Sequence, residues 1–418
     1  MFAMFKTKRF GKFIHWGIYS LLGWHEQAQW RLQMDADAYQ ALAKEFNPVE
    51  YDPKAWVAMA KEAGMDYICF TTKHHDGFCM WDSAYTDYKI TNTPFGRDIL
   101  KELADACHEA GMALSLYYSV PDWHQPNSLN FGGDHELLQP KAGDQPDEQK
   151  YIVYVKNQIT ELLTNYGKIL SFFWDIPPVT KDPSVNALVR QLQPDILINN
   201  RGYDAGDFAT PERTVPECGY FTALTEACNS VGRQSWGYRT AEDYHSHAFL
   251  EASIDRIMAM GGNYVLNVGP DALGRIPQPA VDSLQAVGGW YNRVKPALFA
   301  KPFAAPSGVV TDRPMTRNGD TLYIHFPKPM EAGGFYMEDV LVLPKKAWVL
   351  NNGMPLYTGM DVMPTLCYGG RTVAKPVFHI NGIPVNELAG ETIILALEFE
   401  NLDSAFAANA AKTEESRF

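Results

Sequence analysis

The sequence lacks the features that would place it among membrane, nucleic-acid-binding or disulfide-rich proteins. No apolar run is long enough to cross a membrane, and no signal-peptide stretch follows the basic residues near the N-terminus. Lys and Arg number 36 against 49 Asp and Glu, so the net charge of −13 offers no positive surface for nucleic-acid phosphates. The six cysteines show no C-x-x-C spacing. We therefore expect a cytoplasmic protein, unless a leader has been removed, with reduced cysteines and neither a membrane nor a nucleic-acid partner.

A dinucleotide-binding motif is also absent. No G-x-G-x-x-G follows an early predicted strand, and Gly261-Gly262-Asn263-Tyr264 is typical of a turn into a strand. The Rossmann fold therefore loses its main sequence signal, and we expect no cofactor and no metal. Aromatic residues, in contrast, make up 13% of the chain, and several lie beside polar clusters, as a carbohydrate pocket requires.

Apolar strand-like runs alternate with amphipathic helices over the first three hundred residues. We expect helices near 35–44, 52–64, 96–110, 148–166, 185–192, 240–260 and 277–294. We expect strands near 10–17, 67–72, 112–118, 169–175, 195–200 and 263–268, with the segment 234–239 between the last two and an irregular stretch at 203–232. Polar side chains end several of these strands, which favours an α/β fold of the (β/α)8, TIM-type barrel class over a doubly wound sheet. About seven strands are visible, so one strand of the barrel should be irregular.

The composition changes after residue 296. Three prolines, Pro302, Pro306 and Pro314, mark a linker. Short strand-like runs at 321–326, 340–343 and 392–397 follow, separated by turn residues, which is typical of an antiparallel β-sandwich. The sequence thus predicts a catalytic barrel domain at 1–298, a C-terminal β-sandwich at 299–402 and a tail at 403–418.

The stretch 70–81, FTTKHHDGFCMW, concentrates polar and aromatic residues at the end of a buried strand. Polar groups that bind ligands collect where barrel strands end, so His74 and His75 should lie where a pocket opens. Adjacent strand residues point to opposite sides, and Asp76-Gly77 supplies the irregular backbone that two functional histidines in a row require. The alternative is that one histidine caps the strand, the other is solvated, and the aromatics belong to the core.

Carboxylates supply the second candidate chemistry. Glycoside hydrolysis needs two carboxyl groups, one to attack or to activate water and one to protonate the leaving oxygen. Asp175 ends the most apolar of the early strands and is the best nucleophile candidate, although an Asp before a Pro-rich loop is also a common turn residue. Glu212, Glu217 and Glu226 compete for the acid role, and spacing does not choose among them.

Four segments together resemble the glycoside hydrolase family 29 α-L-fucosidases. They are Phe13-Ile14-His15-Trp16-Gly17, Thr71-Thr72-Lys73-His74-His75-Asp76-Gly77-Phe78, Asn92-Thr93-Pro94-Phe95-Gly96-Arg97-Asp98, and Gly261-Gly262-Asn263-Tyr264 with Asn267-Val268-Gly269-Pro270. The resemblance covers roughly the first 295 residues. It implies a barrel with a C-terminal β-sandwich and a retaining exo-α-L-fucosidase that removes terminal fucose from oligosaccharides or glycoconjugates through a covalent fucosyl-enzyme.

The resemblance also assigns roles to individual residues. It implies that Asp175 is the nucleophile and Glu212 the acid/base, with Glu226 as the alternative. The implied substrate-binding residues are His15, Trp30, His74, His75, Tyr118, Trp174, Arg201 and Trp236. Many family members have Glu-Trp where this chain has Gln29-Trp30, and Glu26 lies nearby without being aligned to that position.

Two other functions stay open. A metal-dependent hydrolase would use His15, His74, His75 and Asp175 as ligands, and a chelator would abolish its activity. A catalytically inactive sugar-binding protein on the same scaffold would bind fucose without turnover. Linkage preference and oligomeric state, including a homo-oligomer, are not determined by the sequence.

Overall fold

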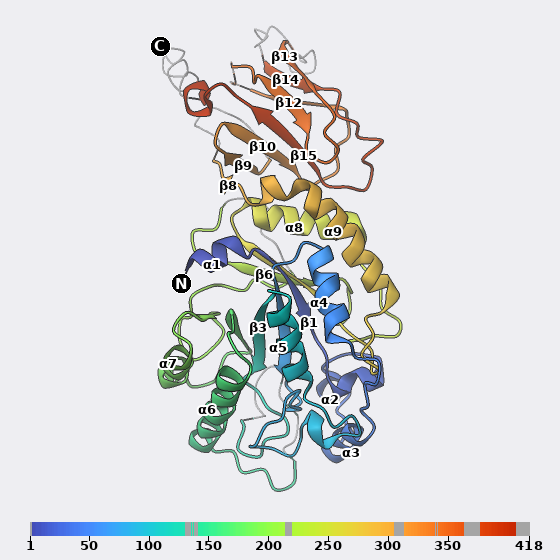
Figure 1. Cartoon of the computed structure of the whole chain (residues 1–418), viewed down its shortest axis with the longest axis vertical. Coiled ribbons are helices and arrows are strands. Elements are labelled where there is room, and N and C mark those ends of the chain that lie inside the picture. The colour runs from blue at the N-terminus through green and yellow to red at the C-terminus, as the bar shows by residue number, and fades with distance from the viewer. Residues whose placement is uncertain are drawn as a thin grey trace. The chain divides into compact units, whose positions relative to one another are not determined.

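The computed structural model describes residues 2–129, 135, 137, 141–213, 220–304, 313–338, 340, 342–362 and 377–406 (Figure 1). The chain forms two compact units. The first consists of Met1–Thr214, Ala223–His245 and Asn263–Gln285, and the second of Val215–Thr222, Ser246–Gly262 and Ala286–Phe418. The boundary expected between residues 298 and 299 stays a prediction.

The first unit is built on a parallel sheet of seven strands. They are β1 (Phe10–Ile14), β2 (Tyr67–Lys73), β3 (Ala113–Ser119), β4 (Ser171–Asp175), β5 (Leu197–Ile198), β6 (Glu226–Ser230) and β7 (Asn263–Val268). Their order is β5-β4-β3-β2-β1-β7-β6. Every residue of β1, β2 and β7 is buried, as expected for strands covered on both faces.

An irregular segment joins the two edge strands of this sheet. Phe208 forms a parallel bridge with Asn199, directly after β5, while Ala209 and Glu212 form parallel bridges with Thr225 and Cys228 at β6. The segment 208–212 therefore takes the place of the eighth strand, which confirms the (β/α)8-like barrel and its one irregular strand.

Strand β6 lies inside the stretch 203–232 that was expected to be irregular, so that expectation was wrong. Its sequence, Glu-Ala-Cys-Asn-Ser, contains no β-branched or aromatic residue and therefore carries no strand signal. The segment 234–239 contains no strand.

Helices surround the strands of the first unit, as the sequence predicts (Figure 1). They are α1 (Phe2–Thr7), α2 (Ala28–Arg31), α3 (Ala36–Ala41), α4 (Pro53–Glu62), α5 (Ile99–Glu109), α6 (Glu148–Asn165) and α7 (Pro183–Leu192), with 3₁₀ turns at Ile18–Leu22, Leu42–Lys44 and Ile90–Asn92. Asp52, Asp98, Asp147 and Asp182 each cap the helix that follows by accepting a hydrogen bond from a first-turn amide. Among the described residues, no helix combines the length and the apolar character needed to cross a bilayer.

Two further helices, α8 (His247–Ala259) and α9 (Gln278–Leu298), precede the strands of the second unit. Helix α8 belongs wholly to the second unit, and α9 begins in the first unit and continues into the second.

The second unit contains two antiparallel sheets. Its strands are β8 (Lys301–Pro302), β9 (Met315–Asn318), β10 (Thr321–Phe326), β11 (Gly334–Met337), β12 (Lys346–Val349), β13 (Tyr357–Asp361), β14 (Val377–Asn381) and β15 (Ile393–Glu398). The sheet orders are β12-β15-β10-β9-β8 and β11-β14-β13. Apolar side chains of both sheets share one buried cluster, for example Ile324 and Leu395 from the first sheet with Phe378 and Ile380 from the second.

This arrangement confirms the β-sandwich and the strands expected at 321–326 and 392–397. The strand expected at 340–343 is not observed, because residues 340, 342 and 343 lie outside any strand and residue 341 lies outside the described part of the chain. Residues 407–418 of the expected tail also lie outside it.

Candidate active site

A cavity with about 510 Å³ of space lies in the first unit, lined by residues at and beyond the carboxyl ends of the barrel strands. Active sites of barrel enzymes lie at this end, because the loops after the strands converge there. The lining residues are Phe13, His15, Glu26, Gln27, His74, His75, Tyr117, His135, Phe173, Asp175, Ile176, Arg201, Glu212, Cys228 and Trp236.

Two carboxylates face each other across one arginine. The Nη1 atom of Arg201 lies 3.0 Å from Oδ1 of Asp175 and 3.0 Å from Oε2 of Glu212. The two carboxyl oxygens are therefore no more than about 6 Å apart. Retaining glycosidases hold their two carboxyl groups roughly 5–5.5 Å apart, whereas inverting enzymes hold theirs at about 6.5 Å or more.

Donors hold both oxygens of Asp175. The hydroxyl of Tyr117 donates to Oδ2 at 2.6 Å, and the backbone N–H of Ile176 donates to Oδ1 at 3.0 Å. Burial raises the pKa of Asp175, whereas the Arg201 guanidinium and the Tyr117 hydroxyl lower it, and the net pKa lies below its ordinary value. Burial also lowers the pKa of His75 to about 4, so this ring is neutral at pH 7 and Arg201 supplies the positive charge. Asp175 is therefore an ionised, immobilised carboxylate, the state that a nucleophile requires.

Ile176 adopts an unusual backbone conformation directly after Asp175. Its φ is 56°, in the left-handed region that β-branched residues rarely enter. This conformation accompanies the hydrogen bond from its amide to Oδ1 of Asp175. Backbone strain of this kind persists only where the surrounding structure enforces it, and it is frequent at active sites.

The hydrogen bonds of His15 determine which of its ring nitrogens carries the proton. Nδ1 of His15 lies 2.7 Å from Oδ1 of Asn267, whose amide nitrogen donates to the carbonyl of Trp236 and to Ser230. Oδ1 of Asn267 is therefore an acceptor, so Nδ1 of His15 donates and Nε2 carries a free lone pair. Burial lowers the pKa of His15 to about 4, which keeps the ring neutral at pH 7.

His75 is held in the same tautomer. Its Nδ1 lies 2.6 Å from the hydroxyl oxygen of Ser119, and that hydroxyl donates to the carbonyl of Pro121. Nδ1 must therefore donate, and Nε2, which lies 3.8 Å from Oδ2 of Asp175, is an acceptor. Burial lowers the pKa of the adjacent His74 well below its ordinary value, and its ring stacks on Tyr117. The cavity thus presents neutral imidazoles beside an ionised carboxylate.

The structure brings most of the predicted site residues together. The predicted residues that line the cavity are His15, His74, His75, Asp175, Arg201, Glu212 and Trp236. Trp30 is not among the lining residues. It stacks on His135, which lines the cavity, with the ring centroids 5.1 Å apart.

Tyr118 and Trp174 do not reach the cavity. The hydroxyl of Tyr118 donates to Gln158 on α6, and the indole N–H of Trp174 donates to Asn186 on α7. The physical reason is the two-residue alternation of strands, which turns these side chains outward and their neighbours inward. Tyr117 is the tyrosine that faces Asp175, and the register of β3 against β4 pairs it with the inward-facing Phe173.

Glu226 also lies away from the cavity. It is the first residue of β6, at the opposite end of the barrel from Asp175, and it accepts a 2.5 Å hydrogen bond from Tyr67, the first residue of β2. Burial raises the pKa of Glu226 to about 7. That pKa would suit an acid catalyst, but the position does not. Glu217, the third glutamate considered, lies outside the described residues.

Glu26, to which the sequence analysis assigns no role, lines the cavity. Its Oε2 accepts hydrogen bonds from the hydroxyl of Ser235 and from the backbone amides of Trp236 and Gly237. It thereby fixes the loop that carries Trp236. Gln29, which stands where many family members have Glu, is buried and does not line the cavity, whereas Glu26 does.

Comparison with known proteins identifies the family. The family model for alpha-L-fucosidase matches residues 1–295. The chain belongs to the alpha-L-fucosidase family. The resemblance of its four sequence segments to glycoside hydrolase family 29 is therefore confirmed, and the protein is a glycoside hydrolase.

Relatives of this alpha-L-fucosidase chain include solved and curated enzymes. Alpha-L-fucosidase isoenzyme 1 from Paenibacillus thiaminolyticus superimposes with a TM-score of 0.83 at 34% identity, covering 96% of this chain and 99% of that one. A variant of alpha-L-fucosidase AlfC, an enzyme of Lactobacillus casei, in complex with Fuca(1,6)GlcNAc gives 0.65 at 33% identity, covering 71% of this chain and 100% of that one. Tissue alpha-L-fucosidase of Bos taurus is 27% identical over 347 residues, which are 73% of this chain and 70% of that protein. These similarities support α-L-fucosidase activity.

Within the described parts of the chain, no group of three or more His, Cys, Asp or Glu side chains has the geometry of a metal site.

Proposed function

We propose that the enzyme is a retaining exo-α-L-fucosidase that hydrolyses terminal α-L-fucosyl linkages of glycans or glycoconjugates by double displacement. The observation that carries this proposal is the pair of carboxylates, Asp175 and Glu212, held within about 6 Å of each other by one arginine nitrogen. This upper limit on the distance between the nearest carboxyl oxygens is compatible with the roughly 5–5.5 Å separation of retaining enzymes, in which one carboxylate attacks directly.

In the first step, a carboxylate oxygen of Asp175 attacks the anomeric carbon of fucose. The bond from that carbon to the leaving oxygen breaks, and Glu212 in its acid form gives the leaving oxygen a proton. In the second step, Glu212 takes a proton from a water molecule. The water oxygen attacks the anomeric carbon and releases Asp175 as a carboxylate, and the proton taken from water returns Glu212 to its acid form.

Neutral histidines support the binding of the sugar. The free Nε2 lone pairs of His15 and His75 accept hydrogen bonds from fucose hydroxyls, with His74 beside them. Trp236 stacks on His15 with ring centroids 5.2 Å apart and offers an apolar face to the C–H groups of the sugar. Arg201 keeps Asp175 ionised until the covalent bond forms.

Replacement of the nucleophile tests the proposal. Asp175→Ala should fold normally and still bind fucose, but turnover should fall by several orders of magnitude, because no other group can form the covalent intermediate. With Asp175→Gly, added azide should restore turnover and give the β-fucosyl azide, the product of a single inverting displacement. Asp105→Ala on the exposed face of α5 is the matched control. Full activity of Asp175→Ala, or azide rescue of another carboxylate variant with the β product, contradicts the assignment.

A further inference from the structure

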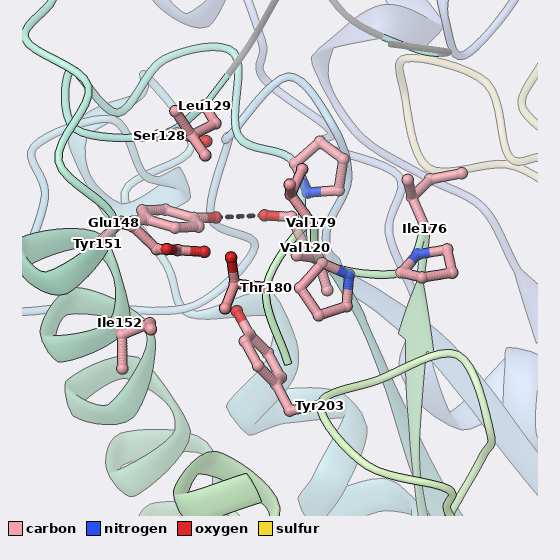
Figure 2. A pocket seen from close by; sticks show the side chains of 13 residues that line it. Val120, Ser128, Leu129, Glu148, Tyr151, Ile152, Ile176, Val179, Thr180 and Tyr203 are labelled. Atoms are coloured by element: carbon pink, nitrogen blue, oxygen red, sulfur yellow. Dashed lines mark hydrogen bonds between the residues drawn. The ribbon is translucent and has the colours of Figure 1, made fainter. Parts of the chain in front are cut away.

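The three-stranded sheet of the second unit carries two exposed tyrosines. Tyr336 on β11 is 37% exposed, and Tyr357 on β13 is 75% exposed. Most tyrosines of the first unit are buried instead. Tyr151 and Tyr203, for example, line a hollow formed by the loops after β3 and β4, and the hydroxyl of Tyr151 donates to the carbonyl of Val120 (Figure 2). Apolar surface that gathers on one exposed face marks a binding site, so the positions of Tyr336 and Tyr357 in their sheet decide what they can do.

Both exposed rings belong to the outer face of this sheet. Strand β14 lies between β11 and β13. The register forms two neighbouring rows of residues across the three strands: Tyr336, His379 and Gly359 in one row, and Gly334, Asn381 and Tyr357 in the next. Residues of one row point to the same face, whereas the next residue along each strand points to the opposite face. Those next residues include Met337, Phe378 and Ile380, which belong to the buried core of the sandwich, so the two rows face away from that core.

Glycines leave room beside each tyrosine. Each row has a tyrosine at one edge and a glycine at the other. A methyl group added at Gly359 would meet no atom of the described residues within 4 Å. Two strand spacings of about 4.8 Å and two residue steps of about 3.4 Å separate the tyrosines, so they lie roughly 12 Å apart. A single pyranose ring is shorter than this distance, so a chain of sugars is needed to cover both rings.

Polar groups occupy the centre of the face. Nδ1 of His379 lies 3.2 Å from Oδ2 of Asp361 on β13, which fixes the imidazole. Neither Nε2 of His379 nor the side-chain amide of the exposed Asn381 has a hydrogen-bond partner among the described residues. In the neutral ring Nδ1 donates to the carboxylate and Nε2 accepts, while the amide of Asn381 both donates and accepts. These groups match hydroxyls, which also donate and accept.

The charge of this face selects a neutral ligand. Its carboxylate, Asp361, is paired with His379, and neither row contains Lys or Arg to hold an anion. The net charge of −13 on each chain opposes the approach of a second copy to a face without compensating positive charge. An apolar peptide would leave His379 and Asn381 without partners. An oligosaccharide supplies C–H faces for the two aromatic rings and hydroxyls for the polar centre.

We propose that the outer face of β11, β14 and β13 binds a neutral oligosaccharide chain. One sugar ring lies on Tyr336, another lies on Tyr357, and the hydroxyls between them bind His379 and Asn381. This site is separate from the active-site cavity, because all of its residues belong to the second unit. It does not depend on the proposed function, since it binds sugar without cleaving a bond.

Saturation-transfer NMR with two neutral tetrasaccharides that lack fucose, cellotetraose and lacto-N-neotetraose, tests the proposal. Excess free fucose occupies the active-site cavity throughout. We expect the wild type to transfer saturation to ring C–H protons of at least one tetrasaccharide. The Kd should rise about 3- to 10-fold in Tyr336→Ala and in Tyr357→Ala, because each variant loses one stacking ring. Tyr336→Phe and Tyr357→Phe keep the ring and should bind as the wild type does.

Tyr85→Ala, which removes a tyrosine of the first unit that is 46% exposed, is the matched control and should keep the wild-type Kd. Thermal melting of each alanine variant should match the wild type, because the side chains removed are exposed. No saturation transfer from the wild type to either tetrasaccharide overturns the proposal, as does a wild-type Kd in both alanine variants or an equal loss in Tyr85→Ala. Inactivity on fucosides would overturn the proposed function alone.

Discussion

Removal of the Tyr117 hydroxyl should shift the pH dependence of the reaction. This hydroxyl donates a 2.6 Å hydrogen bond to Oδ2 of Asp175 in a buried setting. A hydrogen bond to a charged group contributes about 1.5–3 kcal/mol, and about 1.4 kcal/mol corresponds to one pH unit of pKa. The bond favours the ionised carboxylate and therefore lowers the pKa of Asp175. In Tyr117→Phe that pKa should rise by about one to two pH units.

The acid limb of the kcat/KM profile reports this pKa, because the nucleophile must be ionised in the free enzyme. It should move toward higher pH by the same amount in Tyr117→Phe, measured with α-L-fucosyl fluoride over a range of buffers. Tyr118→Phe is a closely matched control, since it removes the hydroxyl of the next residue, which donates to Gln158 outside the cavity. An unmoved acid limb in Tyr117→Phe, or an equal shift in Tyr118→Phe, would refute the reasoning.

Three other perturbations have defined outcomes. Glu212→Ala should lower the turnover of the disaccharide Fuca(1,6)GlcNAc about 10²- to 10⁴-fold but that of α-L-fucosyl fluoride much less, because fluoride leaves without a proton. Equal losses for both substrates in a rate assay would contradict the acid role. Dialysis against EDTA should leave kcat/KM unchanged, and lost activity that returns with added metal would favour the metal-hydrolase alternative. His325→Gln should destabilise the second unit by about 1–3 kcal/mol, because the buried carboxylate of Asp255 loses its 2.7 Å hydrogen bond to the imidazole. Thermal unfolding measures this, and an unchanged melting temperature would contradict it.

The sequence could predict the barrel because its strands are buried on both faces. Such strands are written as continuous apolar runs, and the polar residues that end them, such as His15, His75 and Asp175, meet at one edge of the sheet. Strand β6 was not predicted, because barrel closure holds it in place and its own residues have little preference for a strand. Tertiary context overrides local strand preference in such cases.

Individual cavity residues were harder to predict where one position decides the direction of a side chain. A strand turns successive residues to opposite faces, so the two neighbouring tyrosines point in opposite directions. Tyr117 faces the cavity, whereas Tyr118 faces the helices. Only the pairing of Ser119 with Asp175 in the observed register resolves that choice. Glu26 comes from a turn between helices, where no periodicity indicates direction, and its role depends on a loop two hundred residues away.

The backbone segments that carry the two carboxylates are held in the barrel by different numbers of strand contacts, and this difference matters for engineering the enzyme. Asp175 ends a strand paired along its length with β3, whereas Glu212 belongs to a segment joined to its neighbours by single bridges. Loops tolerate insertion and exchange far better than the strands of a barrel. The stretch that carries Glu212 can therefore be varied as a cassette, in a library that samples new leaving groups while the attacking carboxylate keeps its position.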